Sequence, residues 1–521
     1  MMRRIAPYLL LLIYAWFCYL MAGITWQYVP LDLDVAFLRI KQSYISLPHY
    51  QWAFFLHVYS AMLVLPAGFT QFSTWIRKQH PWLHRGSGWI YASVSVLLAG
   101  PSGLIIGWYA NGGWSSQLAF CLLAILWMTF SWMAIWRIRQ GDVEAHKRWM
   151  YRSFALALSA ITLRAWKFLI VAFFEPRPMD VYRIVAWLGW VLNLLIAEWL
   201  ILRTKQLKKK TSIMKWYLPF CLLLVLWACN ESPSEPTNDN NQVVEEINVE
   251  QTDIEEKEVV ETSVDTTTTE QEVEGNPTEQ LLGYYVGEFE AIQYDTRQSY
   301  VYYNKINISI DSIAGDSLYG HSVVAGNDRP FQGSIRKSSK IYIVEVREPG
   351  DDRYDGIFNF TIAPEQSRMK GTWDAYNPKL AVSKRAYDLN KRRFAYNPNL
   401  ALPEDVQWAE LSAHTEEVPE EGEFITEDVL KFNPSTTLLL KEDVENMYRG
   451  DLEIIRNSIY ARHGYSFKNR KMRFIFDKYI DWYIPVSTDI RHLLTEVEKK
   501  NIDLLKRYER HAERYYDTFG R

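Results

Sequence analysis

The stretch "LPFCLLLVLWACNESPSEP", residues 218–236, divides this chain of 521 residues into two halves of different character. Long apolar runs fill most of the sequence before it, and the sequence after it turns polar at once. A chain of this length predicts several domains, since a domain usually has about 100–200 residues. The predicted fold class is therefore multidomain, and each half has its own architecture.

The overall composition argues against two kinds of protein. The 57 lysines and arginines nearly balance the 61 aspartates and glutamates, so no basic field indicates a nucleic-acid partner. The four cysteines, Cys18, Cys121, Cys221 and Cys229, lie in apolar segments or at the edge of one. The region after residue 229 has none, so it is predicted to fold without disulfides or thiolate metal sites.

The first 210 residues predict a bundle of six transmembrane helices. Crossing a hydrocarbon core of about 30 Å takes roughly 20 residues of helix, and six apolar runs are long enough. The predicted spans are 5–26, 51–73, 87–109, 115–136, 153–174 and 181–202.

Positive charges collect at alternate ends of these spans. One side has Arg3, Arg4, Arg77, Lys78, Arg85, Arg137, Arg139, Lys147, Arg148, Arg152, Arg203, Lys205 and Lys208, Lys209 and Lys210; the other has Arg39, Lys41, Arg177 and Arg183 only. Lysine and arginine accumulate on the cytoplasmic side of membrane proteins. Both ends of the six-span domain, the N-terminus included, are therefore predicted to be cytoplasmic, in a multi-pass protein of a bacterial cell membrane.

Residues 211–229 have the parts of an export signal: a positive region, a short apolar region and a small residue at the end. Leu226, Trp227, Ala228 and Cys229 resemble a bacterial lipobox, which implies cleavage before Cys229 and its lipidation, although Trp227 is bulkier than usual. The alternative is a seventh span, shortened by polar flanks. In both cases the residues after 229 are predicted to be extracytoplasmic.

Three further segments follow. Residues 230–280 are acidic with hardly any aromatic side chain, so a disordered tether is predicted. Residues 281–400 alternate apolar and polar residues between turn signals, which predicts a small antiparallel β-barrel or sandwich. Residues 401–435 are predicted to be a linker.

The last region, 436–521, holds "RNSIYARHGYSFKNRKMRFIFDKYIDWYIP" at 456–485 and predicts a small, mainly helical domain. The stretch resembles the YARHG domain, which is found in exported bacterial proteins. The motif residues are Tyr460, Ala461, Arg462, His463, Gly464, Trp482, Tyr483 and Pro485. A ligand or catalytic role for His463 is one hypothesis. The favoured one is that His463 and Arg462 cap carbonyls and stack on aromatic rings.

Four motifs of the first half occur in one order: "HVYSAMLVLPAGFTQF" from His57, "HRGSGWIY" from His84, "PSGL" from Pro101 and "GDVEAHKRWMYRSFALALSAITLRAW" from Gly141. Together they resemble the predicted membrane family catalogued as domain of unknown function 2306. The resemblance covers about residues 50–200.

Histidines near span ends suggest one kind of chemistry. Two imidazoles from neighbouring helix ends, here His84 and His146, can ligate one b-type haem or contact a quinone or a lipid headgroup. The favoured alternative is a structural pair hydrogen-bonded to the backbone or to headgroups. The candidate site residues are His84, His146, His57, Arg85, Arg148 and Arg152. No metal ligand set is firm.

Arg164 lies about 11 residues into the fifth span, which is roughly 17 Å deep at 1.5 Å per residue. A charged side chain at this depth is costly in lipid and usually faces the bundle interior. We expect Arg164 to point into the bundle, toward Asn193, Glu198 or a ligand. Pro66 and Pro101 are expected to kink their helices and add polar lining to the same interior.

Two function classes remain. One is a non-enzymatic envelope protein that anchors, senses or binds, with the lipid bilayer and an extracytoplasmic protein or cell-wall ligand as partners. The other is a membrane electron carrier with one haem or quinone site. No glycine-rich phosphate loop, metalloprotease helix or serine nucleophile elbow occurs, so an enzyme is the less favoured class. Met214 resembles a second translation start, so a fusion of two independent adjacent proteins also remains open.

Overall fold

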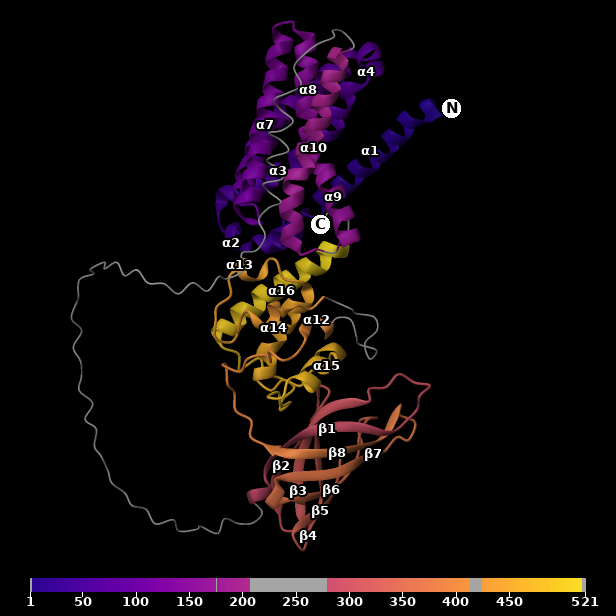
Figure 1. The fold of residues 1–521 in the computed structure, drawn as a ribbon, viewed down its shortest axis with the longest axis vertical. Coiled ribbons are helices and arrows are strands. Elements are labelled where there is room, and N and C mark those ends of the chain that lie inside the picture. The colour runs from indigo at the N-terminus through magenta and orange to yellow at the C-terminus, as the bar shows by residue number, and fades with distance from the viewer. Residues whose placement is uncertain (1, 175, 207–278, 412–423, 518–521) are drawn as a thin grey trace, which may run out of the picture.

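The computed structural model describes residues 2–174, 176–206, 279–411 and 424–517. The signal-like segment 211–229 with Cys229, and nearly all of the predicted tether 230–280, lie outside the described residues. Three parts follow one another along the long axis of Figure 1: a helical bundle, a helical domain from the end of the chain, and a β-barrel.

The bundle contains four described helices that are long and apolar enough to span a membrane: Pro48–Phe72, Pro81–Trp108, Gly113–Arg139 and Pro178–Thr204. A fifth span arises if Val143–Ala157 and Ser159–Phe174, which meet at 42°, are counted as one. The predicted first span falls on the helix Met2–Trp26, in which the described apolar stretch Leu12–Trp26 is shorter than a span. Six spans are therefore not confirmed.

The elements of the bundle follow in chain order. They are α1 (Met2–Trp26), η1 (Ala36–Lys41), α2 (Gln42–Ile45), α3 (Pro48–Phe72), α4 (Thr74–Gln79), α5 (Pro81–Ser93), η2 (Val94–Ala99), α6 (Gly100–Trp108), α7 (Gly113–Arg139), α8 (Val143–Ala157), α9 (Ser159–Phe174) and α10 (Pro178–Gln206). The third span contains a π-helix, η2, which ends two residues before Pro101. The Gly100 amide donates to the carbonyl of Ser95. A proline removes a backbone donor, and a π-turn is one way in which a helix absorbs the disturbance.

The β-rich part is a closed barrel of eight antiparallel strands in sequential order, so the structure decides for the barrel over the sandwich. Its elements are η3 (Glu279–Leu281), β1 (Gly283–Tyr294), β2 (Tyr303–Ala314), β3 (Ser317–Val324), β4 (Asn327–Ser338), β5 (Ile341–Arg347), β6 (Gly356–Ala363), η4 (Pro364–Gln366), β7 (Arg368–Ala375) and β8 (Val382–Arg392). Ile306, Ile308 and Ile310 belong to its buried core. A closed barrel has no free edge strand, which protects it from pairing with another chain.

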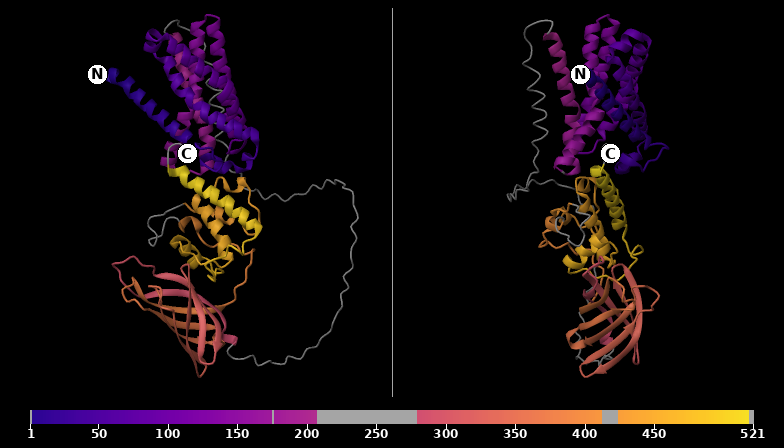
Figure 2. Two further views of the ribbon diagram at one scale, coloured as in Figure 1. Left: turned by 180° about the vertical axis from the view of Figure 1, so that it is seen from behind. Right: turned by 90° about the vertical axis from the view of Figure 1, so that its right-hand side faces the viewer.

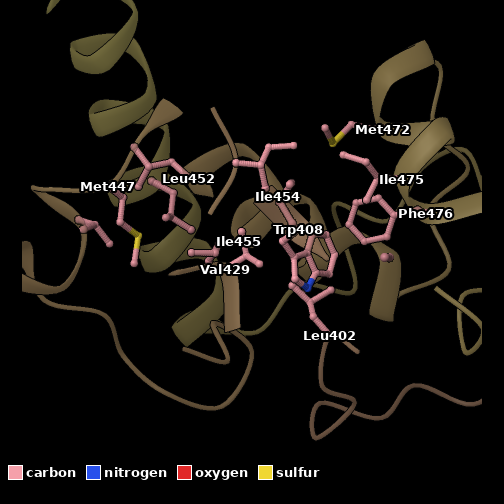
Figure 3. Packing of buried hydrophobic residues seen from close by; sticks show 14 of the residues in the cluster. Leu402, Trp408, Val429, Met447, Leu452, Ile454, Ile455, Met472, Ile475 and Phe476 are labelled. Carbon is pink, nitrogen blue, oxygen red and sulfur yellow. The ribbon is translucent and has the colours of Figure 1, made fainter. Parts of the chain in front are cut away.

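The C-terminal helical domain has one apolar core (Figure 3). Its elements are α12 (Trp408–Leu411), η5 (Glu427–Leu430), α13 (Lys441–Val444), α14 (Arg449–Arg462), α15 (Arg470–Tyr479) and α16 (Glu496–Asp517). Leu402, Trp408, Ile425 and Val429 belong to this core. The prediction of a linker at 401–435 was therefore wrong for its described part, because these scattered apolar residues have no periodicity that would have marked them as core.

The barrel is fixed to the helical domain by buried polar contacts. The Lys305 amide of β2 donates to Asp477 Oδ2 at 3.0 Å, and Lys305 Nζ donates to the carbonyl of Ile480 at 3.0 Å. Asn307 Nδ2 donates to the carbonyl of Pro485 at 2.9 Å. Buried polar groups need such partners, so these bonds specify one orientation of the two parts.

The helical domain also contacts the end of the bundle where α9 ends and α10 begins (Figures 1 and 2). Arg177 Nη1 lies 2.8 Å from Asp428 Oδ2. The Met179 amide donates to Asn446 Oδ1 at 2.9 Å, and Asn446 Nδ2 donates to Asp180 Oδ1 at 3.2 Å. These contacts seat the helical domain on this end of the bundle.

Candidate ligand cavity between the bundle and the last helix

A cavity of about 440 Å³ lies in the half of the bundle that faces the helical domain. Its wall combines residues from α1, η1, α3, η2, α6, α7, α8, α9, α10 and α16. Near the middle of the bundle, Leu65, Ala99, Trp127 and Leu156 line it, and all four are buried. The volume lies within the range of about 300–1,000 Å³ that is typical of small-molecule sites.

Cationic and imidazole side chains gather in this otherwise apolar wall. They are Arg39, His57, Arg164, Lys167, Arg510 and His511. No aspartate or glutamate is among the lining residues in the part of the chain that the structure describes. An anion that entered the cavity would therefore meet several cations in surroundings of low dielectric constant, where charged hydrogen bonds are strong.

Arg164 and Lys167 come from α9 and line the same cavity because residues three apart share one face of a helix. Arg164 Nη1 donates to the carbonyl of Ala160 at 2.6 Å, which holds the guanidinium along its own helix. Lys167 is buried, with 7% of its surface exposed. The two side chains thus place cationic groups beside the apolar interior.

The loop side of the cavity is formed by η1. Arg39 Nη2 donates to the carbonyl of Asp34 at 3.0 Å, and its Nε lies 3.6 Å from Asp34 Oδ1. Lys41, two residues on, is buried and donates to the carbonyl of Tyr109 and to Asn111 Oδ1. Burial lowers the pKa of Lys41 to about 7, and the nearby charge of Lys441 adds to the effect.

Helix α16 contributes Arg510 and His511 from the helical domain to the wall. Arg510 Nε donates to the carbonyl of Lys506 at 3.2 Å. Burial, and then the charge of Lys167, lower the pKa of His511 to about 4, so its imidazole is neutral near pH 7. The last helix of the chain therefore covers a cavity that the first half builds.

His57 reaches the cavity from α3. Its Nδ1 lies 2.8 Å from the carbonyl of Ala99, which is the last residue of the π-helix. A side chain at Gly103 would begin 3.0 Å from His57 Cε1, so glycine leaves the room for this ring. His57 is thus held by the backbone of the irregular third span.

The other predicted site residues lie elsewhere. His84 and His146 belong to the opposite end of the bundle and do not line the cavity. His146 Nδ1 lies 2.8 Å from the carbonyl of Ala134, and His84 Nδ1 is buried without a hydrogen-bond partner in the described residues. Arg85 is exposed and Arg148 is half-buried.

The expected partners of Arg164 have partners of their own. Glu198 accepts hydrogen bonds from Arg152, with Nη2 at 2.9 Å from Oε2. Asn193 Nδ2 donates to Thr162 Oγ1 at 2.9 Å and to the carbonyl of Ala155 at 3.1 Å. Arg164 lines the cavity, while the side chains predicted as its partners are engaged with residues of α8 and α9.

The motif of the C-terminal domain forms a tight internal network. His463 Nε2 lies 2.8 Å from Glu498 Oε2, and the His463 ring stacks on Tyr396 with centroids 4.1 Å apart. Arg462 Nε donates to the carbonyl of Leu400 at 2.8 Å and its guanidinium lies over the ring of Trp482. Arg462 thus binds a carbonyl and lies over an aromatic ring, whereas His463 stacks on an aromatic ring and contacts a carboxylate.

The remaining motif residues complete the local fold. Gly464 has φ of 71°, a left-handed conformation that ends α14. Tyr483 Oη donates to the carbonyl of Tyr465 at 2.7 Å, and Trp482 Nε1 donates to the carbonyl of Ala401 at 2.7 Å. Tyr460 and Ala461 belong to α14 itself.

Comparisons with protein families agree with this division of the chain. Residues 54–201 match the family model described as predicted membrane protein DUF2306. Residues 430–510 match the YARHG domain. Both resemblances predicted from sequence are thereby confirmed. No curated protein and no solved structure was found to match.

The cavity is therefore lined by residues from both matched regions of the chain. Every lining residue between His57 and Val185 belongs to the DUF2306 region, and Arg510 belongs to the YARHG match. The sequence prediction identified Arg164 and His57 but missed Arg39, Lys167, Arg510 and His511. Lys167 had a visible signal, a second cation three residues after Arg164 in an apolar run. The others had none, because only tertiary packing brings them to the cavity.

The stabilising contribution of Glu498 to the YARHG domain is expected to be lost as the pH falls from 4.5 to about 2. Burial alone would raise the pKa of Glu498, but hydrogen bonds from His463 and the Thr495 amide outweigh it and lower the pKa from 4.5 to about 2. A carboxyl group with a depressed pKa stabilises the fold above its unfolded pKa, and this contribution is lost as pH falls through the folded value.

The measurement is the thermal unfolding of the full-length protein at several pH values in this range, monitored by near-UV circular dichroism. Glu498→Gln should remove part of the pH dependence, while Asp503→Asn, an exposed change on the same helix, should leave it as it is. If the unfolding temperature of Glu498→Gln depends on pH as strongly as that of the unchanged protein, Glu498 is not the source of the pH dependence.

Proposed function

We propose that this protein is a membrane-embedded binding protein for an anionic amphiphile, held in the cavity and closed in by the YARHG domain. The observation that carries the proposal is an apolar cavity in a membrane domain whose wall has four lysine or arginine side chains and no described acid. Cations are costly within a membrane domain and usually mark a functional site or pathway. A bound amphiphile can pair its anionic head with the cationic side chains of this wall and bury its apolar tail against the apolar ones.

The arrangement suits one orientation of such a ligand. The anionic head lies near Arg164 and Lys167, within reach of Arg39, and the tail extends toward Trp127 and Leu156. Lys167 and Leu156 are 11 residues apart along α8 and α9, a rise of roughly 16 Å if the bend is neglected. The head is therefore on the side of the YARHG domain and the tail near the bilayer centre.

The position of the YARHG domain supports its predicted extracytoplasmic location. α10 begins beside Asn446 of this domain and ends at Gln206, at the opposite end of the bundle (Figure 1). The positive-inside rule assigns the end with Gln206 to the cytoplasm, which makes the end that contacts the YARHG domain the extracytoplasmic one.

The runner-up is an electron carrier with one haem or quinone at His84 and His146. His84 Nδ1, which is buried and has no hydrogen-bond partner in the described part of the chain, is the observation in its favour. Visible absorbance of the purified full-length protein separates a haem carrier from the binding protein, because haem has a Soret band and a quinone does not. A Soret band that disappears in His84→Ala would support the carrier.

Binding to the cavity is tested by titrating the full-length protein in nanodiscs with three probes: dodecyl phosphate, dodecylphosphocholine and dodecanol. Trp127 lines the cavity, so tryptophan fluorescence can report binding. Dodecyl phosphate is expected to bind at least about tenfold more tightly than the other two, because a charged hydrogen bond contributes about 1.5–3 kcal/mol. Equal affinities for the three probes would contradict the proposal.

A further inference from the structure

A second cavity, of about 290 Å³, lies between the barrel and the YARHG domain. Its wall has two parts. The barrel side provides Glu288, Val301, Tyr302 and Tyr303, and α15 provides Arg470, Arg473, Phe474 and Lys478. The volume is close to the lower limit of small-molecule sites, which fits a compound with a single ring. We refer to it as the interdomain cleft.

Three cations of α15 face one acid in the wall of the interdomain cleft. Arg473 Nη1 donates to the carbonyl of Lys468 at 2.6 Å, and Arg470 Nη2 donates to the carbonyl of Tyr300 at 3.4 Å. The Nε atoms of Arg470 and Arg473 are buried and have no hydrogen-bond partner within the described ranges. A buried, unsatisfied donor on a charged group is costly, so both guanidinium groups retain unused capacity for an anion.

The lining has two more cations than acids, and acids outside it offset part of this excess. Tyr302 Oη donates to Glu290 Oε1, and the charges of Asp477 and Asp481 act on Tyr303. The Asp477 carboxylate also accepts the Lys305 amide at the domain contact. Arg385 adds a further cation behind the loop that carries Tyr302, where its Nη1 donates to the carbonyl of Tyr302 at 3.2 Å. Glu288 is the one lining acid among the described residues, and it is exposed.

Helix stability does not explain this placement. Arg470 is the first residue of α15 and Arg473 lies in its first turn, where the helix dipole disfavours cations. The two walls are also held rigidly, since Lys305 Nζ donates to the carbonyl of Ile480 and Arg392 Nη1 donates to the carbonyl of Asp481 at 2.7 Å. A cationic cleft with fixed walls is preorganised for a ligand.

The aromatic wall indicates what the anion is attached to. Tyr302, Tyr303 and Phe474 give the cleft apolar ring surfaces beside the guanidinium groups. Arginine binds phosphate through two parallel N–H donors, and aromatic residues bury the face of an attached ring. We propose that the interdomain cleft binds a sugar phosphate, either free or as a unit of a phosphate-bearing glycan.

The test is isothermal titration calorimetry on the full-length protein with glucose 6-phosphate, glucose and a teichoic acid preparation. Binding of glucose 6-phosphate should weaken at least tenfold in Arg473→Gln and in Arg470→Gln. Arg491→Gln, which removes a charge from an exposed arginine of the same domain, should leave it unchanged. Tighter binding of the teichoic acid than of the monosaccharide would identify the glycan as the source.

Two results would overturn the proposal: glucose binding as tightly as glucose 6-phosphate, or an equal loss of affinity in Arg491→Gln. If an arginine variant fails to fold, Lys478→Gln replaces it, because Lys478 is exposed and its change should weaken binding without unfolding the domain. The interdomain cleft is independent of the membrane cavity. Dodecyl phosphate binding, measured separately, shows whether the membrane cavity functions when the cleft does not.

Discussion

The full-length protein with Arg164→Gln and Lys167→Gln is expected to bind dodecyl phosphate about 100-fold more weakly than the unchanged protein. Each side chain is expected to supply a charged hydrogen bond to the phosphate, worth about 1.5–3 kcal/mol, and about 1.4 kcal/mol corresponds to a tenfold change. Glutamine retains a donor and much of the side-chain length but loses the charge. The measurement is the fluorescence titration in nanodiscs.

A matched control removes two charges from the bundle without touching the cavity. Arg139 and Arg203 are exposed and do not line it, so Arg139→Gln with Arg203→Gln should keep the original affinity. Dodecanol, which has no charge, should bind both double variants equally well and so report an intact cavity. A similar loss in both double variants would attribute the effect to the membrane surface and contradict the site.

Asp428→Lys is expected to release the YARHG domain from the bundle and to raise the dissociation rate of dodecyl phosphate at least tenfold. Asp428 is buried between Arg177 and Lys431, at 2.8 Å from each. Breaking a buried ion pair costs about 3–5 kcal/mol, and the lower end applies here because Arg177 keeps 32% of its side chain exposed. A lysine at this position also repels Arg177 and Lys431, in addition to removing the ion pair.

The measurement combines stopped-flow dissociation with hydrogen exchange. Exchange should rise in η1 and in the first turn of α10, which contact the helical domain, and stay low in the barrel. Asp503→Lys makes the same charge change at an exposed position of α16 and serves as the control. Faster exchange with an unchanged dissociation rate would mean that the domain docks on the bundle but does not close the cavity.

The sequence predicted the elements that have a strong local signal. Apolar runs located the four long spans within a few residues, and the alternation around Ile308 located the barrel strands. The break at Leu158 between α8 and α9 was missed because neither proline nor glycine marks it. The core position of Trp408 was missed because a single aromatic residue in a polar stretch has no period.

The candidate site was predictable only where one residue was conspicuous by itself. Arg164 was identified because a charge in the middle of an apolar run is costly in lipid and therefore usually faces the bundle interior. Arg510 and His511 lie on a highly charged helix, where such residues are ordinary. Their role depends on the docking of the YARHG domain through Asp428 and Asn446, which is a tertiary contact between distant parts of the chain.

The central claim is tested most directly by a cryo-electron microscopy map of the full-length protein in nanodiscs with dodecyl phosphate. Headgroup density is expected between Arg164 and Lys167, with the alkyl chain running past Trp127 toward Leu156 and α16 in place over the cavity. A map in which the amphiphile lies only on the outer surface of the bundle, with the cavity empty, would contradict it.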